Sequence, residues 1–425
     1  MAETIYAVAT ARGRAGVAVL RISGPRSHEL CALLCGRKPT ARRLSLVRLS
    51  WQGRPLDRGL AVLFDEGASF TGEKMAEFHV HGGLASVAAI ERALGDSGLA
   101  RPAVAGEFTR RALENGRLDL TAVEGLADLI DAETEAQRAL ALRLMEGEAA
   151  LRIADWRGRL VRAGALLAAL LDFAEEDLPD TVLEEARGLL AGLADALADE
   201  RAAGARSERL REGFEVAIVG PPNVGKSTLL NRLAGREAAI TSEVAGTTRD
   251  VIEVRMDLGG LAVTLLDTAG LRETSDAIER EGIRRALDRA GAADLRVFLG
   301  GGDEMIAPRP GDIHRRAKAD LPGGAGLGVS GKTGEGVDAL LREIETTLAA
   351  RVSGGGTLSR ERHRVALTRG EEAVRAAAAL LEDDSRAELA AEELHHALRA
   401  LDSLVGKVDV EDLLDEIFRS FCIGK

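Results

Sequence analysis

The spacing of hydrophobic and polar positions changes three times along the chain. Residues 1–117 hold short apolar runs bounded by Gly and Pro, which predict strands at 17–24, 59–64 and 75–83. From about 118 to 212, Leu and Ala recur every three or four residues among Glu and Arg. That spacing predicts long amphipathic helices.

At residue 214 the helical pattern gives way to a buried strand, a Gly-rich turn and a helix, and such units alternate until about 350. RVSGGGTLS (351–359) is typical of a linker, and helical spacing returns from 360 to 421. We therefore expect an α/β domain inserted into a helical domain. The boundaries are 1–117 for an N-terminal α+β domain, 118–212 and 351–425 for the two helical parts, and 213–350 for the inserted domain.

Composition narrows the class of protein. The 425 residues are 46% hydrophobic but include few aromatics (Phe 9, Trp 2, Tyr 1), so the cores must be aliphatic. The longest apolar run, 163–171, is about half of a membrane span, and the N-terminus lacks a secretory pattern. Cys31, Cys35 and Cys422 make no disulfide framework. We expect a cytoplasmic protein without a membrane segment.

Charge is distributed unevenly. The net charge of −12 argues against indiscriminate coating of nucleic acid, which depends on neutralising phosphates. Residues 1–50 nevertheless contain nine Lys or Arg and two Glu. A basic N-terminal zone and an acidic remainder indicate that any RNA contact is shared with, or delegated to, a partner.

GPPNVGKS, from Gly220 to Ser227, fits the pattern GxxxxGK[ST] and follows a predicted strand. The glycines allow successive backbone N–H groups to face phosphate oxygens, and the helix that follows presents its positive end. Lys226 can reach the terminal phosphates, and the hydroxyl of Ser227 can bind Mg²⁺. This segment predicts a nucleotide-binding P-loop.

Two further elements of a switch domain follow in the expected order. LAVTLLDTAG (261–270) is an apolar strand that ends in Asp267, a carboxylate suited to the Mg²⁺ shell, and Gly270 can offer its N–H to the γ-phosphate. Between this strand and the P-loop lies AGTTRD (245–250), where Thr248 can complete the metal shell. Together the three elements predict a Ras-like, doubly wound GTPase domain.

Recognition of guanine is less complete in the sequence. The best match to an N-K-x-D box is Ala317-Lys318-Ala319-Asp320, in which Ala replaces Asn. Asp320 can still accept hydrogen bonds from groups that adenine lacks, and 330–332 (SGK) supplies the usual donor loop. A neighbouring backbone group or a water would have to replace the missing Asn contact.

Leu271 occupies the position where Ras-like enzymes carry the Gln that orients the attacking water. Leucine can neither donate nor accept a hydrogen bond. Water activation must therefore come from elsewhere, either from a monovalent cation beside Asn223 or from a carboxylate in LRETSDAIERE (271–281).

With these motifs, the chain resembles the MnmE (TrmE) family of tRNA-modifying GTPases over nearly its whole length. The resemblance rests on ETIYAVATARGRAGVAVLRISG, on SFTGE and HVHGG (69–73, 79–83), on 106–120 and 124–132, on the motifs above and on the terminal FCIGK. The family implies an N-terminal dimerisation domain that binds a folate, a helical domain split in sequence, and an inserted G domain. A GTP-dependent RNA-binding assembly factor is the alternative function, and it would need no folate pocket.

The resemblance also implies a chemistry and partners. The family is a K⁺-activated GTPase that acts as a homodimer and, in a heterotetramer with the FAD protein MnmG, adds a carboxymethylaminomethyl or aminomethyl group to C5 of the wobble uridine of certain tRNAs. The one-carbon donor is a 5-formyl- or methylene-tetrahydrofolate. GTP, Mg²⁺ and K⁺ are the other small molecules expected.

Residue roles carried over from the family fall into four sets. The catalytic residue would be Glu279, which positions the attacking water. Mg²⁺ would be held by Ser227 and Thr248, and K⁺ by Asn223, Ser242, Val244 and Thr247. The folate would contact Arg21, Glu77, Arg117 and Lys425. GTP would contact Asn223, Val224, Gly225, Lys226, Ser227, Thr228, Ser242, Glu243, Val244, Ala245, Gly246, Thr247, Thr248, Asp267, Thr268, Ala269, Gly270, Lys318, Asp320, Ser330, Gly331 and Lys332.

The folate residues suit their expected ligand. A carboxylate such as Glu77 can bind the amide-like donors of a pterin, and Arg21 or Arg117 can pair with a glutamate tail. His79 and His81 are two apart on the same predicted strand, which favours a role in the pocket or in packing over a metal site. The role of Cys422 stays open.

Overall fold

The computed structural model describes residues 3–172, 181–236, 238–240, 253–267, 284, 287–300, 306–321, 327–382, 386–408, 414, 417–419, 421 and 424. It divides into two compact units, Met1–Ala127 with Asp402–Lys425, and Asp128–Leu401. Within the described part of the chain, no helix is both long enough and apolar enough to cross a membrane.

The N-terminal unit is built on one six-stranded sheet in the order β3-β4-β5-β2-β1-β6. Its strands are β1 (Ile5–Val8), β2 (Ala15–Ser23), β3 (Ser45–Trp51), β4 (Arg54–Phe64), β5 (Met75–Gly82) and β6 (Arg101–Pro102). Its helices are α1 (Ser27–Cys35), α2 (Leu84–Asp96), α3 (Glu107–Glu114) and α4 (Leu120–Asp131), which runs on into the second unit.

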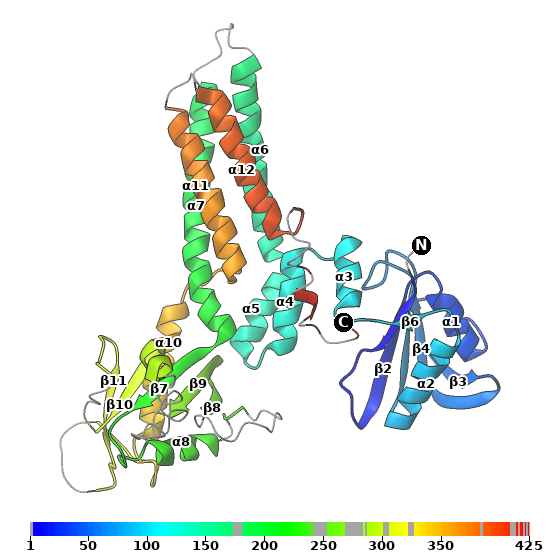
Figure 1. The fold of residues 1–425 in the computed structure, drawn as a ribbon, viewed down its shortest axis with the longest axis horizontal. Helices are drawn as coiled ribbons and strands as arrows, with labels where there is room; N and C mark the ends of the chain where they lie inside the picture. The colour runs from blue at the N-terminus through cyan, green and yellow to red at the C-terminus, as the bar shows by residue number, and fades with distance from the viewer. Residues whose placement is uncertain are drawn as a thin grey trace. The chain divides into compact units, whose positions relative to one another are not determined.

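Alternating apolar residues on the strands form one buried face of this sheet, which packs against α1 and α2 (Figure 1). Leu20, Phe78 and Leu63 belong to this core and are fully buried. The strands predicted at 17–24, 59–64 and 75–83 are confirmed as parts of β2, β4 and β5.

The end of the chain packs against the N-terminal unit. A Cβ on Gly106 would lie 2.8 Å from the ring of Phe418, and a Cβ on Gly424 would lie 2.2 Å from the carbonyl oxygen of Val8. Only glycine permits these close approaches. The predicted helical part 351–425 includes this tail, and Asp402–Lys425 belongs to the same compact unit as the sheet.

The second unit contains a helical bundle formed by α5 (Glu135–Met145), α6 (Glu148–Asp172), α7 (Thr181–Glu212), α11 (Glu361–Leu380) and α12 (Ala387–Leu404). The long helices run side by side (Figure 1). Because α7 packs against both α6 and α11, the two helical stretches form one domain, which confirms the predicted split.

The predicted linker at 351–359 is only partly right. A helix, α10 (Val337–Val352), extends into it, and Thr357 is fully buried. The Glu200 carboxylate on α7 accepts hydrogen bonds from the backbone of Thr357 (3.3 Å) and Leu358 (3.4 Å). The glycines allow the chain to pass close to α7, so the second half of this segment is part of the bundle.

The inserted α/β part has a six-stranded sheet in the order β12-β11-β10-β7-β9-β8, parallel except for the antiparallel pair β8 and β9. The elements are β7 (Phe214–Val219), α8 (Lys226–Ala234), β8 (Glu253–Leu258), β9 (Leu261–Asp267), β10 (Leu295–Leu299), β11 (Ile313–Ala317) and β12 (Gly328–Val329). Apolar clusters lie on both faces, as in a doubly wound sheet. The predicted α/β class is confirmed.

Candidate functional site

The P-loop turns sharply between β7 and α8 at residues that adopt unusual backbone angles. Gly220 has φ +158°, and a Cβ there would lie 2.5 Å from the carbonyl oxygen of Leu299. Asn223 has φ +60°, and Gly225 has φ +115° immediately before α8 begins. This geometry brings the loop to the helix N-terminus, where backbone N–H groups bind phosphate.

Lys226, Ser227 and Asp267 meet at the carboxyl end of the central strands. The buried Lys226 ammonium donates to the carbonyl oxygens of Gly220 (2.6 Å) and Pro221 (3.1 Å). Ser227 Oγ donates to Asp267 Oδ2 at 2.9 Å, and Asp267 is 6% exposed. A hydroxyl and a buried carboxylate are oxygen ligands that suit Mg²⁺.

A pocket of about 360 Å³ lies beside the P-loop helix. It brings together three stretches that are far apart in the sequence, at 224–229, 317–321 and 329–332. Its lining residues are Val224, Gly225, Thr228, Leu229, Leu299, Ala317, Lys318, Asp320, Leu321, Val329, Ser330, Gly331 and Lys332. The structure thus gathers the residues predicted to contact the base and the adjoining part of the P-loop.

The 330–332 loop is held against α8 by Arg232. Its Nε donates to the Gly331 carbonyl at 2.8 Å and its Nη2 donates to the Lys332 carbonyl at 3.0 Å. A Cβ on Gly331 would lie 2.5 Å from the backbone nitrogen of Leu229, so the loop and helix touch directly. No sequence motif marks Arg232 for this role, because its partners lie 99 and 100 residues away.

Asp320 is prepared to act as an acceptor. A hydrogen bond from Ser330 lowers the pKa of Asp320, and the positive charges of Lys332 and Lys318 lower it further. Lys318 has φ +54°, so the chain turns between β11 and Asp320. Ala317 lines the same pocket with only a methyl group, so any contact that Asn would make there is absent from this side chain.

Several predicted residues lie outside the described part of the chain. They are Ser242, Glu243, Val244, Ala245, Gly246, Thr247, Thr248, Thr268, Ala269, Gly270, Glu279 and Lys425, together with Leu271 and Cys422.

In the N-terminal unit, two predicted folate residues are direct partners. Arg21 and Glu77 are opposite each other on β2 and β5, and Arg21 Nε donates to Glu77 Oε1 at 2.9 Å. The second carboxylate oxygen lies 3.3 Å from His79 Nε2. The Arg21 guanidinium also stands over the ring of Phe70, 5.8 Å from its centroid. These groups lie on the sheet face opposite α1 and α2.

Arg117 approaches this group through the SFTGE segment. A Cβ on Gly72 would lie 3.2 Å from Arg117 Cγ, and Asn115 donates to the Thr71 carbonyl at 2.7 Å. The segment thus connects Phe70, beneath Arg21, to the start of the 115–117 turn. The structure places Arg21 and Glu77 together and Arg117 against the same loop.

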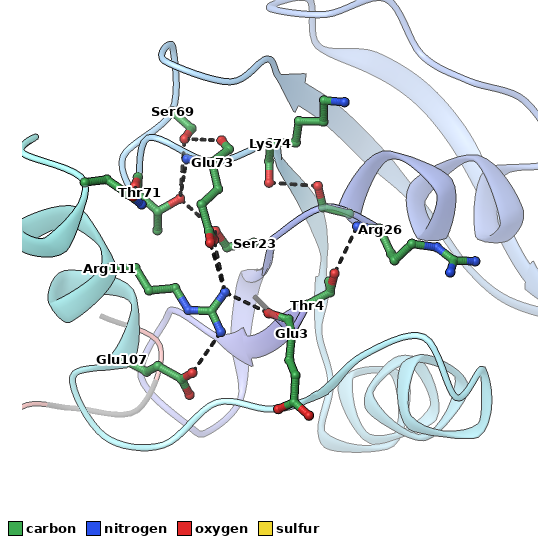
Figure 2. Close-up of polar contacts among 12 residues, drawn as sticks. Glu3, Thr4, Ser23, Arg26, Ser69, Thr71, Glu73, Lys74, Glu107 and Arg111 are labelled. Atoms are coloured by element: carbon green, nitrogen blue, oxygen red, sulfur yellow. Dashed lines mark hydrogen bonds and ion pairs between the residues drawn. The ribbon is translucent and has the colours of Figure 1, made fainter. Parts of the chain in front are cut away.

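A buried polar network fixes that loop (Figure 2). Glu73 accepts from Ser23 Oγ at 2.7 Å and from Arg111 Nη1 at 3.2 and 3.1 Å. Ser23 and Thr71 share a further hydroxyl contact at 2.7 Å. Arg111 also donates from Nη2 to Glu107 at 2.9 Å. The resemblance rests partly on the segments 69–73 and 106–120, but their sequences do not predict that Glu73 of one pairs with Arg111 of the other.

Comparison with protein-family models and with known proteins shows which family the whole chain belongs to. The family model for the GTP-binding protein TrmE N-terminus matches residues 4–117, and the model for the MnmE helical domain matches residues 120–422. The tRNA modification GTPase MnmE of Cereibacter sphaeroides is 57% identical over 427 residues and that of Roseobacter denitrificans 52% over 427 residues, each covering 100% of both chains. The chain belongs to the MnmE family.

As a member of the MnmE family, the chain is a GTP hydrolase that acts in tRNA modification. A solved structure of Aquifex aeolicus Era is 28% identical, with a TM-score of 0.26, covering 32% of this chain and 56% of that one. The two MnmE family models meet near residue 118, close to the boundary expected between the N-terminal and helical domains.

Proposed function

We propose that this MnmE-family chain is a K⁺-activated GTPase that modifies the wobble uridine of certain tRNAs at C5. With MnmG it would add a carboxymethylaminomethyl or aminomethyl group, using a 5-formyl- or methylene-tetrahydrofolate as one-carbon donor. The observation that carries the proposal is the full-length family match, joined to a P-loop and base pocket assembled on one sheet edge.

The described residues support GTP and Mg²⁺ binding. The Lys226 ammonium lies inside the P-loop, where it donates to loop carbonyls and could donate to phosphate oxygens instead. The Ser227–Asp267 pair supplies oxygen ligands for the metal. Asp320, with its lowered pKa, offers a charged acceptor to the guanine N1–H and amino group. Thr248 would complete the metal shell when the γ-phosphate is present.

The catalytic part of the proposal rests on the sequence. Leu271 cannot orient water, so we assign that task to Glu279, acting through a second water. Asn223 would hold K⁺ with its side chain, helped by the backbone of Ser242 and Val244 and by Thr247. A cation there neutralises charge that develops between the β- and γ-phosphates, as an arginine finger does.

The folate part rests on the face of the N-terminal sheet that carries Arg21 and Glu77. Arg21 holds the Glu77 carboxylate in place, which leaves that carboxylate able to accept the paired N–H donors of a pterin. Arg117 would pair with the glutamate tail, and Lys425 follows Gly424, which lies against the Val8 carbonyl of β1. The folate supplies the one-carbon unit, while these residues bind and orient it.

We further propose that the N-terminal domains form a homodimer, that the dimer joins MnmG in a heterotetramer, and that the complex acts on tRNA in the cytoplasm.

The K⁺ claim is tested by GTP hydrolysis in KCl and in NaCl at equal ionic strength. We expect much faster hydrolysis in KCl, and Asn223→Ala should remove the difference. Glu279→Ala should slow hydrolysis by orders of magnitude with nucleotide affinity almost unchanged, because the group acts on water. Equal rates in the two salts would rule out K⁺ activation.

The modification claim is tested by mass spectrometry of tRNA nucleosides from a deletion strain. We expect C5-modified wobble uridines to disappear and to return with the wild-type gene but not with Arg21→Ala. Wobble uridines that stay modified in the deletion strain would favour an assembly factor instead. Folate binding by the purified protein, measured by calorimetry, separates the Arg21→Ala defect from a general loss of folding.

A further inference from the structure

The segment from Arg37 to Arg58 is strongly basic, and neither the nucleotide site nor the folate residues use it. It contains one acidic residue, Asp57, in a chain whose net charge is −12. We call residues 37–58 the basic edge, because β3 is the outermost strand of the N-terminal sheet. Its seven cationic residues, all exposed, are Arg37, Lys38, Arg42, Arg43, Arg48, Arg54 and Arg58.

These charges are not neutralised within the described part of the chain, where none of the seven forms an ion pair. Arg37 Nη2 donates to the carbonyl of Leu46 at 3.2 Å, which leaves its charge uncompensated. Asp57 is occupied by His81, whose Nδ1 lies at 2.8 Å and whose backbone N–H donates at 2.9 Å. Several exposed arginines on the helices, by contrast, do form ion pairs. Arg138, for example, pairs with Glu135 at 2.6 Å.

Two of the arginines are direct cross-strand partners. Arg48 on β3 is opposite Arg58 on β4. Opposed residues of antiparallel strands have Cβ atoms about 4.5–5.5 Å apart, and like charges at that spacing repel each other. An anion bound between or above the two guanidinium groups would relieve that repulsion, as bidentate arginine contacts to phosphate do.

This arginine pair lies on the same sheet face as the proposed folate residues. Arg58 is two residues from Leu60, Leu60 is opposite His79 on β5, and His79 is two residues from Glu77. Side chains two apart on a strand share a face. The basic edge therefore borders the face on which Arg21 meets Glu77.

Protection of an edge strand from pairing is the simpler explanation for charges on β3. It would account for Arg48, but Arg58 is on β4, which is paired on both sides. Arg37, Arg42 and Arg43 precede the strand altogether. Edge protection therefore leaves most of the basic edge unexplained.

We propose that the basic edge binds the sugar-phosphate backbone of the tRNA substrate and places the wobble nucleotide next to Arg21 and Glu77. The inference rests on the proposed function. Contacts of this kind position an RNA without reading its sequence. They also explain how an acidic chain with few aromatic residues can hold RNA in one region only.

The test compares two full-length variants that each lose four positive charges. The first carries Arg42→Gln, Arg43→Gln, Arg48→Gln and Arg58→Gln. The matched control removes ion-paired arginines of the helices with Arg138→Gln, Arg159→Gln, Arg162→Gln and Arg364→Gln. The dissociation constant for an unmodified tRNA transcript is measured across a salt series. GTP hydrolysis without tRNA reports on the folding of the P-loop unit, and urea unfolding followed through Trp51 reports on the folding of the N-terminal unit.

We expect the basic-edge variant to bind the transcript at least about tenfold more weakly at low salt. The slope of log affinity against log salt should fall by about 3, because each lost phosphate contact removes about 0.7–0.9. The control variant should keep the wild-type affinity and slope.

Wild-type affinity and slope in the basic-edge variant would overturn the inference. Unchanged tRNA binding combined with lost modification in the presence of MnmG would also overturn it, because the surface would then contact the protein partner. If the wild-type protein binds no tRNA and its deletion leaves wobble uridines unchanged, the proposed function fails. The two failures are therefore distinguishable.

Discussion

Arg111 Nη1 lies 3.2 and 3.1 Å from the two carboxylate oxygens of Glu73, and both side chains are largely buried. The pair joins helix α3 to the loop at 69–74 (Figure 2). Phe70 on this loop lies beneath the Arg21 guanidinium. A buried charge that loses its partner is costly, whereas an intact pair contributes little net stability. The pair therefore fixes the position of the loop more than it raises overall stability.

Glu73→Ala should lower the free energy of unfolding of the N-terminal unit by about 1–3 kcal/mol, because Arg111 and Ser23 lose a buried acceptor while Arg111 keeps its bond to Glu107. Trp51 lies in this unit and Trp156 in the other, and the chain has 2 Trp. Urea unfolding followed by Trp51 fluorescence in a Trp156→Phe background measures the change. The control is Glu114→Ala, which removes an exposed glutamate from α3, the helix that carries Arg111. Equal midpoints for both variants would show that the pair does not hold the loop.

Stability should fall in acid because of Glu107. Burial raises the pKa of Glu107, but hydrogen bonds from Arg101, the Val104 amide and Arg111 outweigh that effect and lower it to about 2. A lowered pKa gives stability that is complete above the ordinary carboxyl value and is lost as the pH falls from about 4.5 towards 2. One pKa unit is about 1.4 kcal/mol, and partial exposure of Arg101 reduces the total to about 2 kcal/mol.

The measurement is the pH dependence of urea unfolding, again followed through Trp51, for wild type and Glu107→Gln. The variant should lose less stability than wild type between pH 5 and pH 3. Parallel curves would assign the acid sensitivity to other carboxylates.

Asp267→Asn should weaken the dependence of GTP affinity on Mg²⁺. The amide can still accept the hydrogen bond from Ser227 Oγ, so the local geometry is retained while the negative charge near the metal is lost. We expect the affinity gained on adding Mg²⁺ to fall about tenfold or more, with binding in EDTA unchanged. Titration of a fluorescent GTP analogue at several Mg²⁺ concentrations measures both. Equal Mg²⁺ dependence would remove Asp267 from the metal shell.

Ala317→Asn should tighten binding of guanine nucleotides about three- to tenfold, the effect of one added hydrogen bond of 0.5–1.5 kcal/mol. The side chain would enter the pocket lined by Lys318 and Asp320. Calorimetry with GDP gives the affinity, and Ala319→Asn, two residues further along, controls for the added amide. Unchanged GDP affinity in Ala317→Asn would show that 317–320 is not the guanine box.

Much of the nucleotide site could be predicted because its residues follow one another in short motifs. GxxxxGK[ST] after a strand dictates the turn, the helix and the places of Lys226 and Ser227, and the structure confirms that Asp267 ends the adjoining parallel strand. The α/β class and the split helical domain could also be predicted, because hydrophobic spacing is likewise a pattern of residues close together in the sequence.

Contacts between distant segments could not be predicted. Arg232 bonds to carbonyls of the 330–332 loop, and nothing in the sequence of α8 marks its side chain for that role. Gly356 and Thr357 look like part of a flexible linker, yet Glu200 binds this backbone more than 150 residues away in sequence. Such pairings depend on how the elements pack, which composition and periodicity do not encode.

A single residue, Gly213, connects the end of helix α7 to the first strand of the α/β sheet, β7. A helix of 32 residues is about 48 Å long at 1.5 Å per residue. A rotation of about 10° at Gly213 would therefore move the far end of α7 by about 8 Å. Gly213 has φ +89°, an angle that glycine alone tolerates freely, so the direction in which α7 leaves the sheet depends on this residue.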